Sequence, residues 1–549
     1  MTIYTSPYAP VRPPSCSVYT FHFSLTHPGS QYWKHPPSAP AFTSAPTGNT
    51  LTRAQLRSLT LQLFHGLKHP PPSIRGRLVP FARGDVVLVF SPNSLAWPVV
   101  LFGLLAGGAC LTLANPAYTP AELAHQYTDS GAGLVFVHPN LLDSVLEMLK
   151  LVGVTGEHAR RRIVVMQYEP GEAAERKGSG KDLVWLEDLL GLGEEKEEEK
   201  FEGDGPDGVN ATAFLCYSSG TTGKPKGVMT THKNMVAVNL MLFAAFSEMD
   251  PSKDVWMAML PFYHMYATAQ YDLTSLHYIT CGAAPIGSQL LFAAKEKLAS
   301  VGAHVVIGQA YGLTETSPHT HQLPRESAMR KVGSVGLLIP NLEARLVLDD
   351  DDGDEGVDAP EWDDTEEALG GPGVRMSARG ELWLRGPTIM KGYLNNPAAT
   401  RNAITPAGWF KTGDICIRDE EGFWYIVDRK KELIKYKGLQ VAPAELEALL
   451  LTHPQLVDAA VIGVDDPVQA TELPRAFVVP ASPPSSLAKF AQEIQDWMAS
   501  RVANHKKLRG GVVIVDHIPK SPSGKILRRQ LRDRVKAVTE ASRPVRAKL

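Results

Sequence analysis

The stretch from Tyr217 to Val228, YSSGTTGKPKGV, contains the residue types that bind phosphate. Serine, threonine and glycine fill residues 218–223 and follow an apolar, strand-like run at 211–217, so the backbone N–H groups of this loop can surround phosphate oxygens. The loop is not a Walker A loop, because its glycines are too closely spaced and Pro225 stands where Ser or Thr would ligate magnesium. The sequence therefore predicts a nucleotide-binding enzyme that does not belong to the Walker A class.

This string resembles the phosphate loop of the adenylate-forming superfamily, which includes acyl-CoA synthetases, coumarate–CoA ligases, beetle luciferases and peptide-synthetase adenylation domains. Further segments resemble the other motifs of that family and follow in the family's order. They are PFYH at 261–264, GAAP at 282–285, QAYGLTE at 309–315, WFKTGD at 409–414, DRKKELIKYKGLQ at 428–440 and PKSPSGKILRR at 519–529. The segment at 428–440 is especially similar to the coumarate–CoA ligase version.

The resemblance implies how these segments handle ATP and coenzyme A. Tyr311 would stack on the adenine, Thr314 would touch the α-phosphate, and Asp414 would accept hydrogen bonds from both ribose hydroxyls. Arg429 would contact the ribose and phosphate, and Glu315 would hold Mg²⁺. The residues that the resemblance assigns to ATP and coenzyme A are Ser218, Ser219, Gly220, Thr221, Thr222, Gly223, Lys226, Ala284, Tyr311, Gly312, Thr314, Asp414, Arg429, Lys437 and Gly438.

By the same likeness, four residues act at the reacting groups. Lys525 is the catalytic lysine of the C-terminal loop, Lys435 and Gln440 approach the adenylate, and His264 lies beside the carboxylate. The segment at 428–440 resembles the family's interdomain hinge, and Lys431 would lie at its pivot. Taken alone, a histidine such as His264 is more often packed in a core, and a single lysine is more often a solvated side chain.

The resemblance implies an α/β fold in two domains. Residues 1–427 would form a large adenylation domain of stacked sheets and helices, and residues 428–549 a small, mobile α+β lid. A carboxylate attacks the α-phosphorus of ATP and pyrophosphate leaves, so catalysis is mostly positioning and charge neutralisation by Lys525, Mg²⁺ and the phosphate loop. The lid then swings and presents another face to coenzyme A, which yields acyl-CoA and AMP. The favoured substrate is an aryl, phenylpropanoid-type or medium-chain acid.

The composition bounds the class of protein independently. A chain of 549 residues exceeds one core, and 44% hydrophobic and 21% charged residues with a net charge of −3 are typical of a soluble globular protein without a nucleic-acid partner. Five widely separated cysteines favour a reducing compartment over a zinc or disulfide framework. Residues 86–121 carry no charge, but internal Pro and Gly residues predict a strand, turn, helix and buried strand rather than a membrane span.

Two segments are acidic. Residues 194–202 are mixed but mostly acidic, and residues 349–367 contain acidic residues and no basic one. We expect both to be solvated surface loops or disordered insertions. The second segment lacks the ligand spacing of an EF-hand, so the sequence assigns no metal there.

The connection between Ala267 and Gly282 departs from the family pattern. Only the residues TAQYDLTSLHYITC lie between them, where the family has several helices and strands, so about fifty to sixty residues are absent near 268–272. The absent part normally supplies strands and one wall of the acyl pocket. We favour a skipped exon or splicing error over a reduced form of the enzyme. The alternative function is then a nucleotide-binding pseudoenzyme or an inactive, mis-spliced product.

The C-terminal residues Ala547, Lys548 and Leu549 resemble the peroxisomal Ser-Lys-Leu signal. We therefore expect a peroxisomal protein, and otherwise a cytoplasmic one. A peptide-synthetase-type domain would be followed by a carrier domain, and only about twenty residues follow Arg529, so a free-standing ligase is favoured. The expected partners are small molecules, namely the acid, ATP and coenzyme A, with no transmembrane segment.

Overall fold

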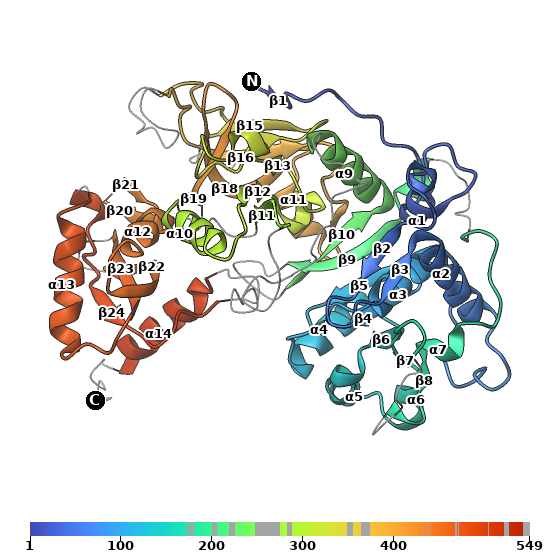
Figure 1. Cartoon of the computed structure of the whole chain (residues 1–549). Helices are drawn as coiled ribbons and strands as arrows, with labels where there is room; N and C mark the ends of the chain where they lie inside the picture. Colours follow the sequence, from blue (N-terminus) through green and yellow to red (C-terminus); the bar gives the residue numbers. More distant parts are fainter. Residues whose placement is uncertain are drawn as a thin grey trace.

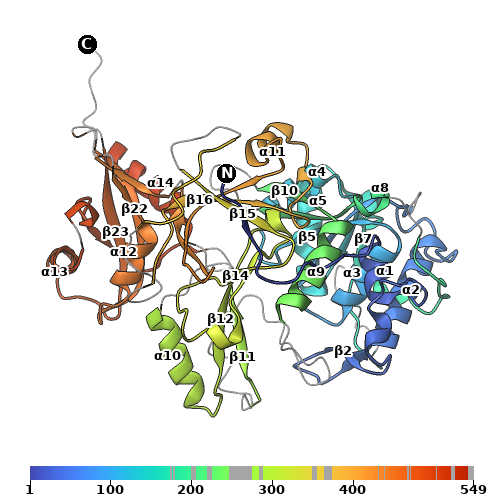
Figure 2. The same ribbon diagram turned by 90° about the horizontal axis from the view of Figure 1, so that it is seen from above.

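The chain folds into a large N-terminal part and a small C-terminal part, which lie side by side in a computed structural model (Figures 1 and 2). Both parts mix helices and strands, so the predicted α/β fold class is confirmed. The structure describes residues 1–172, 176, 180–199, 206–218, 225–246, 275–282, 288–348, 355–363, 374–430, 432–437, 439–466, 469, 471–502, 504–520 and 526–541.

A mostly parallel sheet of eight strands forms the centre of the first half of the chain. Its order is β17-β10-β9-β5-β4-β6-β7-β8, and the six strands from β9 to β8 run parallel to one another, whereas β10 is antiparallel to β9. The strands are β4 (Val86–Phe90), β5 (Cys110–Ala114), β6 (Leu134–Val137), β7 (Ile163–Val165), β8 (Val184–Trp185), β9 (Thr212–Ser218), β10 (Lys226–Thr231) and β17 (Gly392–Tyr393).

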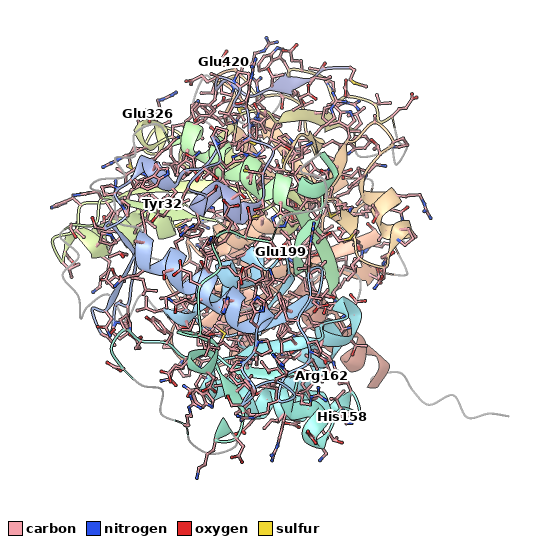
Figure 3. All side chains as sticks on the ribbon, turned by 90° about the vertical axis from the view of Figure 1, so that its right-hand side faces the viewer. Tyr32, His158, Arg162, Glu199, Glu326 and Glu420 are labelled. Carbon is pink, nitrogen blue, oxygen red and sulfur yellow. The ribbon has the colours of Figure 1, made fainter. Side chains whose placement is uncertain are left out.

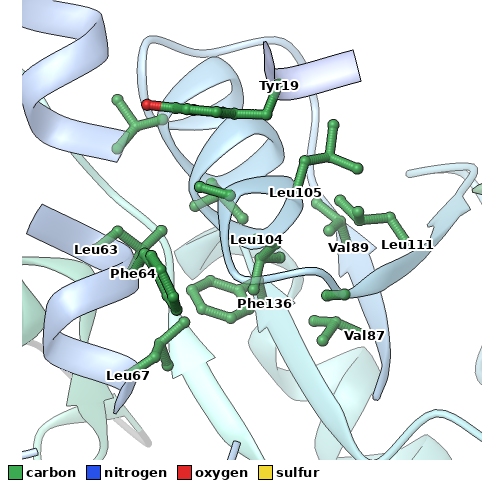
Figure 4. Packing of buried hydrophobic residues seen from close by; sticks show 14 of the residues in the cluster. Tyr19, Leu63, Phe64, Leu67, Val87, Val89, Leu104, Leu105, Leu111 and Phe136 are labelled. Atoms are coloured by element: carbon green, nitrogen blue, oxygen red, sulfur yellow. The ribbon is translucent and has the colours of Figure 1, made fainter. Parts of the chain in front are cut away.

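Helices cover both faces of this sheet because alternate strand residues point to opposite sides. Val87 and Val89 of β4 belong to one core, whereas Leu88 and Phe90 belong to the other. The first core receives α1 (Val18–Phe23), α2 (Arg53–Lys68), α3 (Ala96–Ala106), α7 (Leu186–Leu189) and α9 (His232–Ala245). The second receives α4 (Pro120–Ser130), α5 (Leu142–Leu151) and α6 (Gly156–Arg160). Figure 4 shows the first core, where Phe64 of α2 lies beside Phe136.

The uncharged run at 86–121 forms β4, α3 and β5, as the sequence predicted. Val99, Val100 and Leu104 of α3 are completely buried, so the run belongs to the interior of the α/β sandwich. Within the described part of the chain, we find no helix with the length and apolar character needed to cross a membrane.

Two further sheets complete the large part. An antiparallel sheet has the order β1-β15-β16-β18-β19, with β1 (Tyr4–Thr5), β15 (Glu343–Val347), β16 (Gly380–Arg385), β18 (Phe410–Arg418) and β19 (Trp424–Arg429). The other sheet consists of β11 (Tyr278–Cys281), β12 (Val306–Tyr311), β13 (His321–Gln322) and β14 (Leu337–Leu338), and α10 (Ser288–Ala299) packs on it. Smaller elements are β2 (Pro40–Thr43), β3 (Thr50–Thr52), α8 (Pro206–Val209) and α11 (Pro397–Ala403).

The small C-terminal part has its own apolar cores, built from residues after 433. Its elements are β20 (Ile434–Tyr436), β21 (Leu439–Val441), α12 (Pro443–Leu450), β22 (Leu456–Asp466), β23 (Thr471–Pro480), α13 (Leu487–Ala499), β24 (Val512–Ile514) and α14 (Arg528–Ala541). The domain boundary at 427/428 stays a prediction. β19 extends to Arg429 and pairs with β18 of the large part.

The expectation of surface loops for the two acidic segments is confirmed where the structure describes them, since residues 194–199 and 355–363 form no helix or strand and all but Ala359 are exposed or partly exposed. At 194–199 the chain packs along α2: the Ser58 hydroxyl donates to Glu194 at 2.6 Å, and the backbone N–H of Glu199 donates to the carbonyl of Ala106 at 2.7 Å. In the second segment, Asp358 pairs with the buried Arg345 at 2.6 Å. These surface loops are attached to the rest of the large part by hydrogen bonds and ion pairs of their carboxylates.

The connection between Ala267 and Gly282, which the sequence predicts to be shortened, lies largely outside the described residues. Its described end forms β11, which pairs in parallel with β12 and lies at the edge of the four-stranded sheet. Leu276, Ile279 and Cys281 around this strand are only partly buried.

Candidate functional site

The predicted adenine segment forms a strand that ends in a tight turn. β12 ends at Tyr311, and a 3₁₀ turn spans Thr314–Thr316. Gly312 lies between them, where a Cβ atom would stand 1.7 Å from the carbonyl oxygen of Pro318. Only glycine permits this close backbone approach. The chain therefore turns directly after β12, and this turn sets the positions of Thr314 and Glu315.

Asp414 lies where the predicted adenine and ribose residues meet. The Tyr311 hydroxyl donates to Asp414 Oδ2 at 2.5 Å, and Arg429 Nε lies 3.3 Å from Asp414 Oδ1. Asp414 and Arg429 are directly paired residues of β18 and β19. Asp414 is 3% exposed. Burial raises the pKa of Tyr311, so its hydroxyl stays protonated and acts as a donor.

Glu315 joins the turn to the end of the phosphate-loop strand. The Ser218 hydroxyl and the Tyr393 hydroxyl each donate to Glu315 Oε1 at 3.0 Å. Burial raises the pKa of Tyr393, and Lys226 Nζ lies 4.9 Å from the centre of its ring. Ser218 and Lys226 are paired residues of β9 and β10, so the two ends of the predicted phosphate loop lie side by side, next to Glu315.

These contacts lie at the carboxyl end of β9, which is the edge where open α/β sheets bind ligands. The structure also contains a cavity of about 320 Å³ near the starts of β4, β5 and β9, lined in part by Gly84, Cys110 and Thr212. That cavity is at the opposite end of the parallel strands and takes no part in the cluster around Glu315 and Asp414.

The hinge residues lie on the small domain. Lys435 belongs to β20 and Lys437 follows it with φ of 47°, and both side chains are exposed. The backbone N–H of Lys435 donates to Glu472 at 2.7 Å, and that of Lys437 donates to the Thr471 hydroxyl at 2.7 Å. The hairpin of β20 and β21 is thus fixed to β23 through its backbone, while the lysine side chains point outward.

Several predicted site residues lie outside what the structure describes. Gln440 is described only as a backbone position of β21. The others fall entirely outside the described residues, and they are Ser219, Gly220, Thr221, Thr222, Gly223, His264, Ala284, Gly438 and Lys525. The roles assigned to all predicted site residues stay predictions.

Two groups of contacts that support the cluster around Glu315 were not predicted from the sequence. Tyr393 donates to Glu315, but it is a single tyrosine without a motif around it. The Tyr217 hydroxyl donates to Asp129 at 2.7 Å, and His125 of α4 contacts the carbonyl of Pro225 at 3.0 Å. Helix α4 therefore holds both ends of the phosphate loop, and no local signal in the sequence connects residues that far apart.

A further group that the sequence did not predict is a buried ionic cluster at the predicted hinge, residues 428–440. Arg528 contacts Glu432 at 2.5 Å and both carboxylate oxygens of Glu447 at 2.7 and 2.8 Å. Burial raises the pKa of Glu447 to about 7 and that of Asp428 to about 6. One arginine at the start of α14 is therefore the counter-charge of several carboxyl groups next to the hinge.

The chain is similar to known protein families and to individual known proteins. The chain matches the family model of the AMP-binding enzyme over residues 30–270 and 266–394, and that of the AMP-binding enzyme C-terminal domain over residues 445–525. A probable CoA ligase, CCL5 of Humulus lupulus, is 35% identical over 590 aligned positions, which cover 96% of this chain and 95% of the relative.

Two other proteins are similar over most of their length. Peroxisomal OPC-8:0-CoA ligase 1 of Arabidopsis thaliana is 32% identical, with 94% of this chain and 93% of the relative covered. The solved structure of o-succinylbenzoate CoA synthetase of Bacillus subtilis in complex with ATP and magnesium ion has a TM-score of 0.63 at 24% identity, with 89% of this chain and 95% of that chain covered. The likeness to this solved structure shows that the two proteins share a fold.

Proposed function

Because the chain belongs to the adenylate-forming AMP-binding enzyme family, whose similar members are CoA ligases, we propose that it joins a carboxylic acid to coenzyme A through an acyl-adenylate. It is an AMP-forming acid–thiol ligase. The observation that carries the proposed site is the contact of Asp414 with Tyr311 and Arg429, which gathers a carboxylate, an aromatic ring and a guanidinium at one point.

These three residues fit the adenosine part of ATP. A carboxylate is the natural acceptor for two neighbouring ribose hydroxyls, because it has two acceptor oxygens and no donor. Tyr311 supplies a ring face for the adenine, and Arg429 supplies positive charge for the phosphate. We assign Asp414 to the ribose because its carboxylate is buried, with Tyr311 in contact with one oxygen and Arg429 with the other.

Glu315 and Ser218 fit Mg²⁺, which prefers carboxylate and other oxygen ligands. When bound between them and the phosphates of ATP, the ion would neutralise charge on the triphosphate. Ser218 and Lys226 are paired beside Glu315 at the two ends of the predicted phosphate loop, and we propose that the backbone N–H groups of this loop bind the phosphates. ATP and Mg²⁺ are therefore the proposed co-substrate and ion of this site.

The proposed reaction has two balanced steps. The acid's carboxylate oxygen attacks the α-phosphorus, an acyl–phosphate bond forms, and the bond to pyrophosphate breaks. The thiol of coenzyme A then attacks the acyl carbon, loses its proton and displaces AMP. Lys525 and His264 are proposed to act in the first step, Lys437 and Gly438 in the second, and Lys435 and Gln440 at the adenylate. We propose an aryl, phenylpropanoid-type or medium-chain acid as substrate.

This function predicts acid-dependent release of pyrophosphate. The purified full-length chain with ATP and Mg²⁺ is expected to release pyrophosphate only when a carboxylic acid is present, because the acid is the attacking group. A coupled pyrophosphate assay over a panel of aryl, phenylpropanoid and medium-chain acids measures this, and mass spectrometry identifies acyl-CoA after coenzyme A is added. Binding of ATP without release for any acid would contradict the proposal.

The second candidate, an inactive form that lacks an internal segment, rests on a specific observation. The two matches to the AMP-binding model meet at residues 266–270, and the aligned span with the Humulus lupulus relative, 590 positions, exceeds the 549 residues of this chain. Among the strands that the structure describes, β11 lies at the edge of its sheet, which fits the loss of neighbouring strands. Sequencing of the transcript across codons 262–285 decides between them, since an additional in-frame segment would mean that the complete enzyme differs from this chain.

We propose that the chain is imported into peroxisomes through Ala547, Lys548 and Leu549. A similar protein is named as peroxisomal, which supports the proposal. An N-terminal fluorescent fusion of the full chain is expected to give punctate fluorescence that overlaps a peroxisomal marker. Deletion of Leu549 should make it diffuse, whereas Arg543→Ala, just upstream, should not. Punctate fluorescence without Leu549 would refute the proposal.

A further inference from the structure

Two histidines and one glutamate converge on the outer face of α2, away from the predicted ATP site. His65 lies in the last turn of α2 and His69 follows the helix, four residues later. His65 Nδ1 lies 2.9 Å and His69 Nε2 lies 3.3 Å from the same oxygen, Glu195 Oε1. The three donor atoms lie within 4.8 Å of one another.

The glutamate is held in place by its own segment. The backbone N–H of Glu195 donates to the carbonyl of Leu61 at 3.4 Å, and Glu199, labelled in Figure 3, pairs with Lys68 at 3.1 Å. The Glu194 carboxylate accepts from Ser58 on the same helix. Glu195 therefore faces the two imidazoles because several contacts fix the chain on both sides of it.

We propose that His65, His69 and Glu195 bind one divalent transition-metal ion, with Zn²⁺ as the best-fitting case. His69 caps the end of α2, and its backbone N–H still donates to the carbonyl of His65 at 2.8 Å, so the two histidines keep the four-residue spacing by which a histidine pair shares an ion. Two imidazole nitrogens and one carboxylate oxygen suit Zn²⁺, Ni²⁺ or Cu²⁺ and do not suit Mg²⁺ or Ca²⁺. This site does not depend on the proposed ligase activity.

The exposure and charge of the surroundings permit an ion to enter. The His69 side chain is 54% exposed, so the site is open to solvent on one side and leaves a position for water. Lys68 lies 4.0 Å from Glu195, and its closer partner is Glu199, so its charge is balanced by a second carboxylate. An ion bound here would connect the acidic segment at 194–199 to α2.

Isothermal titration calorimetry tests the site, with Zn²⁺ alone added to the full-length chain that carries no histidine tag. We expect one ion per chain, and His69→Ala and Glu195→Gln should each raise the Kd at least about tenfold, because each removes one of three ligands. The absorption of Co²⁺ in place of Zn²⁺ reports directly on the ligand set.

The exposed His158 on α6, labelled in Figure 3, provides the matched control. His158→Ala removes one imidazole elsewhere on the surface and should leave the Kd unchanged. Circular dichroism of all variants establishes that they are folded. Absence of binding to the unmodified chain, or equal weakening by His69→Ala and His158→Ala, would overturn the proposal.

Discussion

Replacing Asp414 by asparagine is expected to lower kcat/KM for ATP in the adenylation step about 100-fold. The carboxylate is 3% exposed, and it accepts the Tyr311 hydroxyl and faces Arg429. An amide of the same shape has one acceptor oxygen and no charge, so it loses the counter-charge of Arg429 and part of the proposed bonding to the ribose. A hydrogen bond to a charged group contributes about 1.5–3 kcal/mol, and about 1.4 kcal/mol corresponds to a factor of ten.

Acid-dependent exchange of labelled pyrophosphate into ATP measures this effect. Tyr311→Phe is the matched control, because it keeps the ring proposed to stack on adenine and removes only the hydroxyl that contacts Asp414. We expect this variant to lose about tenfold or less. If Asp414→Asn retained the kcat/KM of the unmodified chain while its fold was intact, Asp414 would not contact the ribose.

The parts of the fold that the sequence predicted are those with strong local patterns. The uncharged run at 86–121 contained its own interruptions, and these interruptions became the turns between β4, α3 and β5. The motifs around Tyr311 and Asp414 were recognisable because handling of a nucleotide restricts both residue type and order. Tyr311 and Asp414 meet in space because two separate sheets lie against each other there, which sequence spacing does not encode.

The features that escaped prediction depend on partners far away in the chain. The acidic segment at 194–199 is a surface loop, as its composition predicted, but its ion pairs with Arg57, His65 and Lys68 of α2 could not be read from the sequence. Tyr393 reaches Glu315 across 78 residues. Composition gives the charge of a segment, whereas its partner is determined by the tertiary fold.

The ionic cluster behind the hinge leads to the largest expected effect on stability. Arg528→Gln should destabilise the small domain by about 3–5 kcal/mol, because it leaves the buried Glu432 and Glu447 without their cation. Arg528 also donates to the carbonyl of Val461 in β22, so the same change detaches the start of α14 from the sheet. The predicted catalytic lysine, Lys525, lies three residues earlier. The adenylation step should therefore weaken together with the domain.

This loss should grow as the pH rises. Burial raises the pKa of Glu447 to about 7 and that of Asp428 to about 6, above the values of about 4.3 and 3.9 in an unfolded chain. A carboxyl group with a raised pKa favours the folded state while it is protonated, and this contribution is lost as the pH rises from the unfolded to the folded pKa. The positive charge of Arg528 stabilises the ionised carboxylates of Glu447 and Asp428, so it reduces this loss of stability. Its removal should therefore cost more at pH 8 than at pH 5.

Hydrogen exchange of the full-length chain measures the local free energy of opening in β22 and β23, so the small domain is followed without separating it. Arg534→Gln is the matched control, because Arg534 is exposed on the same helix and its replacement should change stability by less than about 0.5 kcal/mol. We expect faster exchange in Arg528→Gln and a larger difference at pH 8, after correction for intrinsic exchange rates. Equal protection in both variants at both pH values would mean that the carboxyl groups do not need Arg528, and that the hinge is stabilised by apolar packing alone.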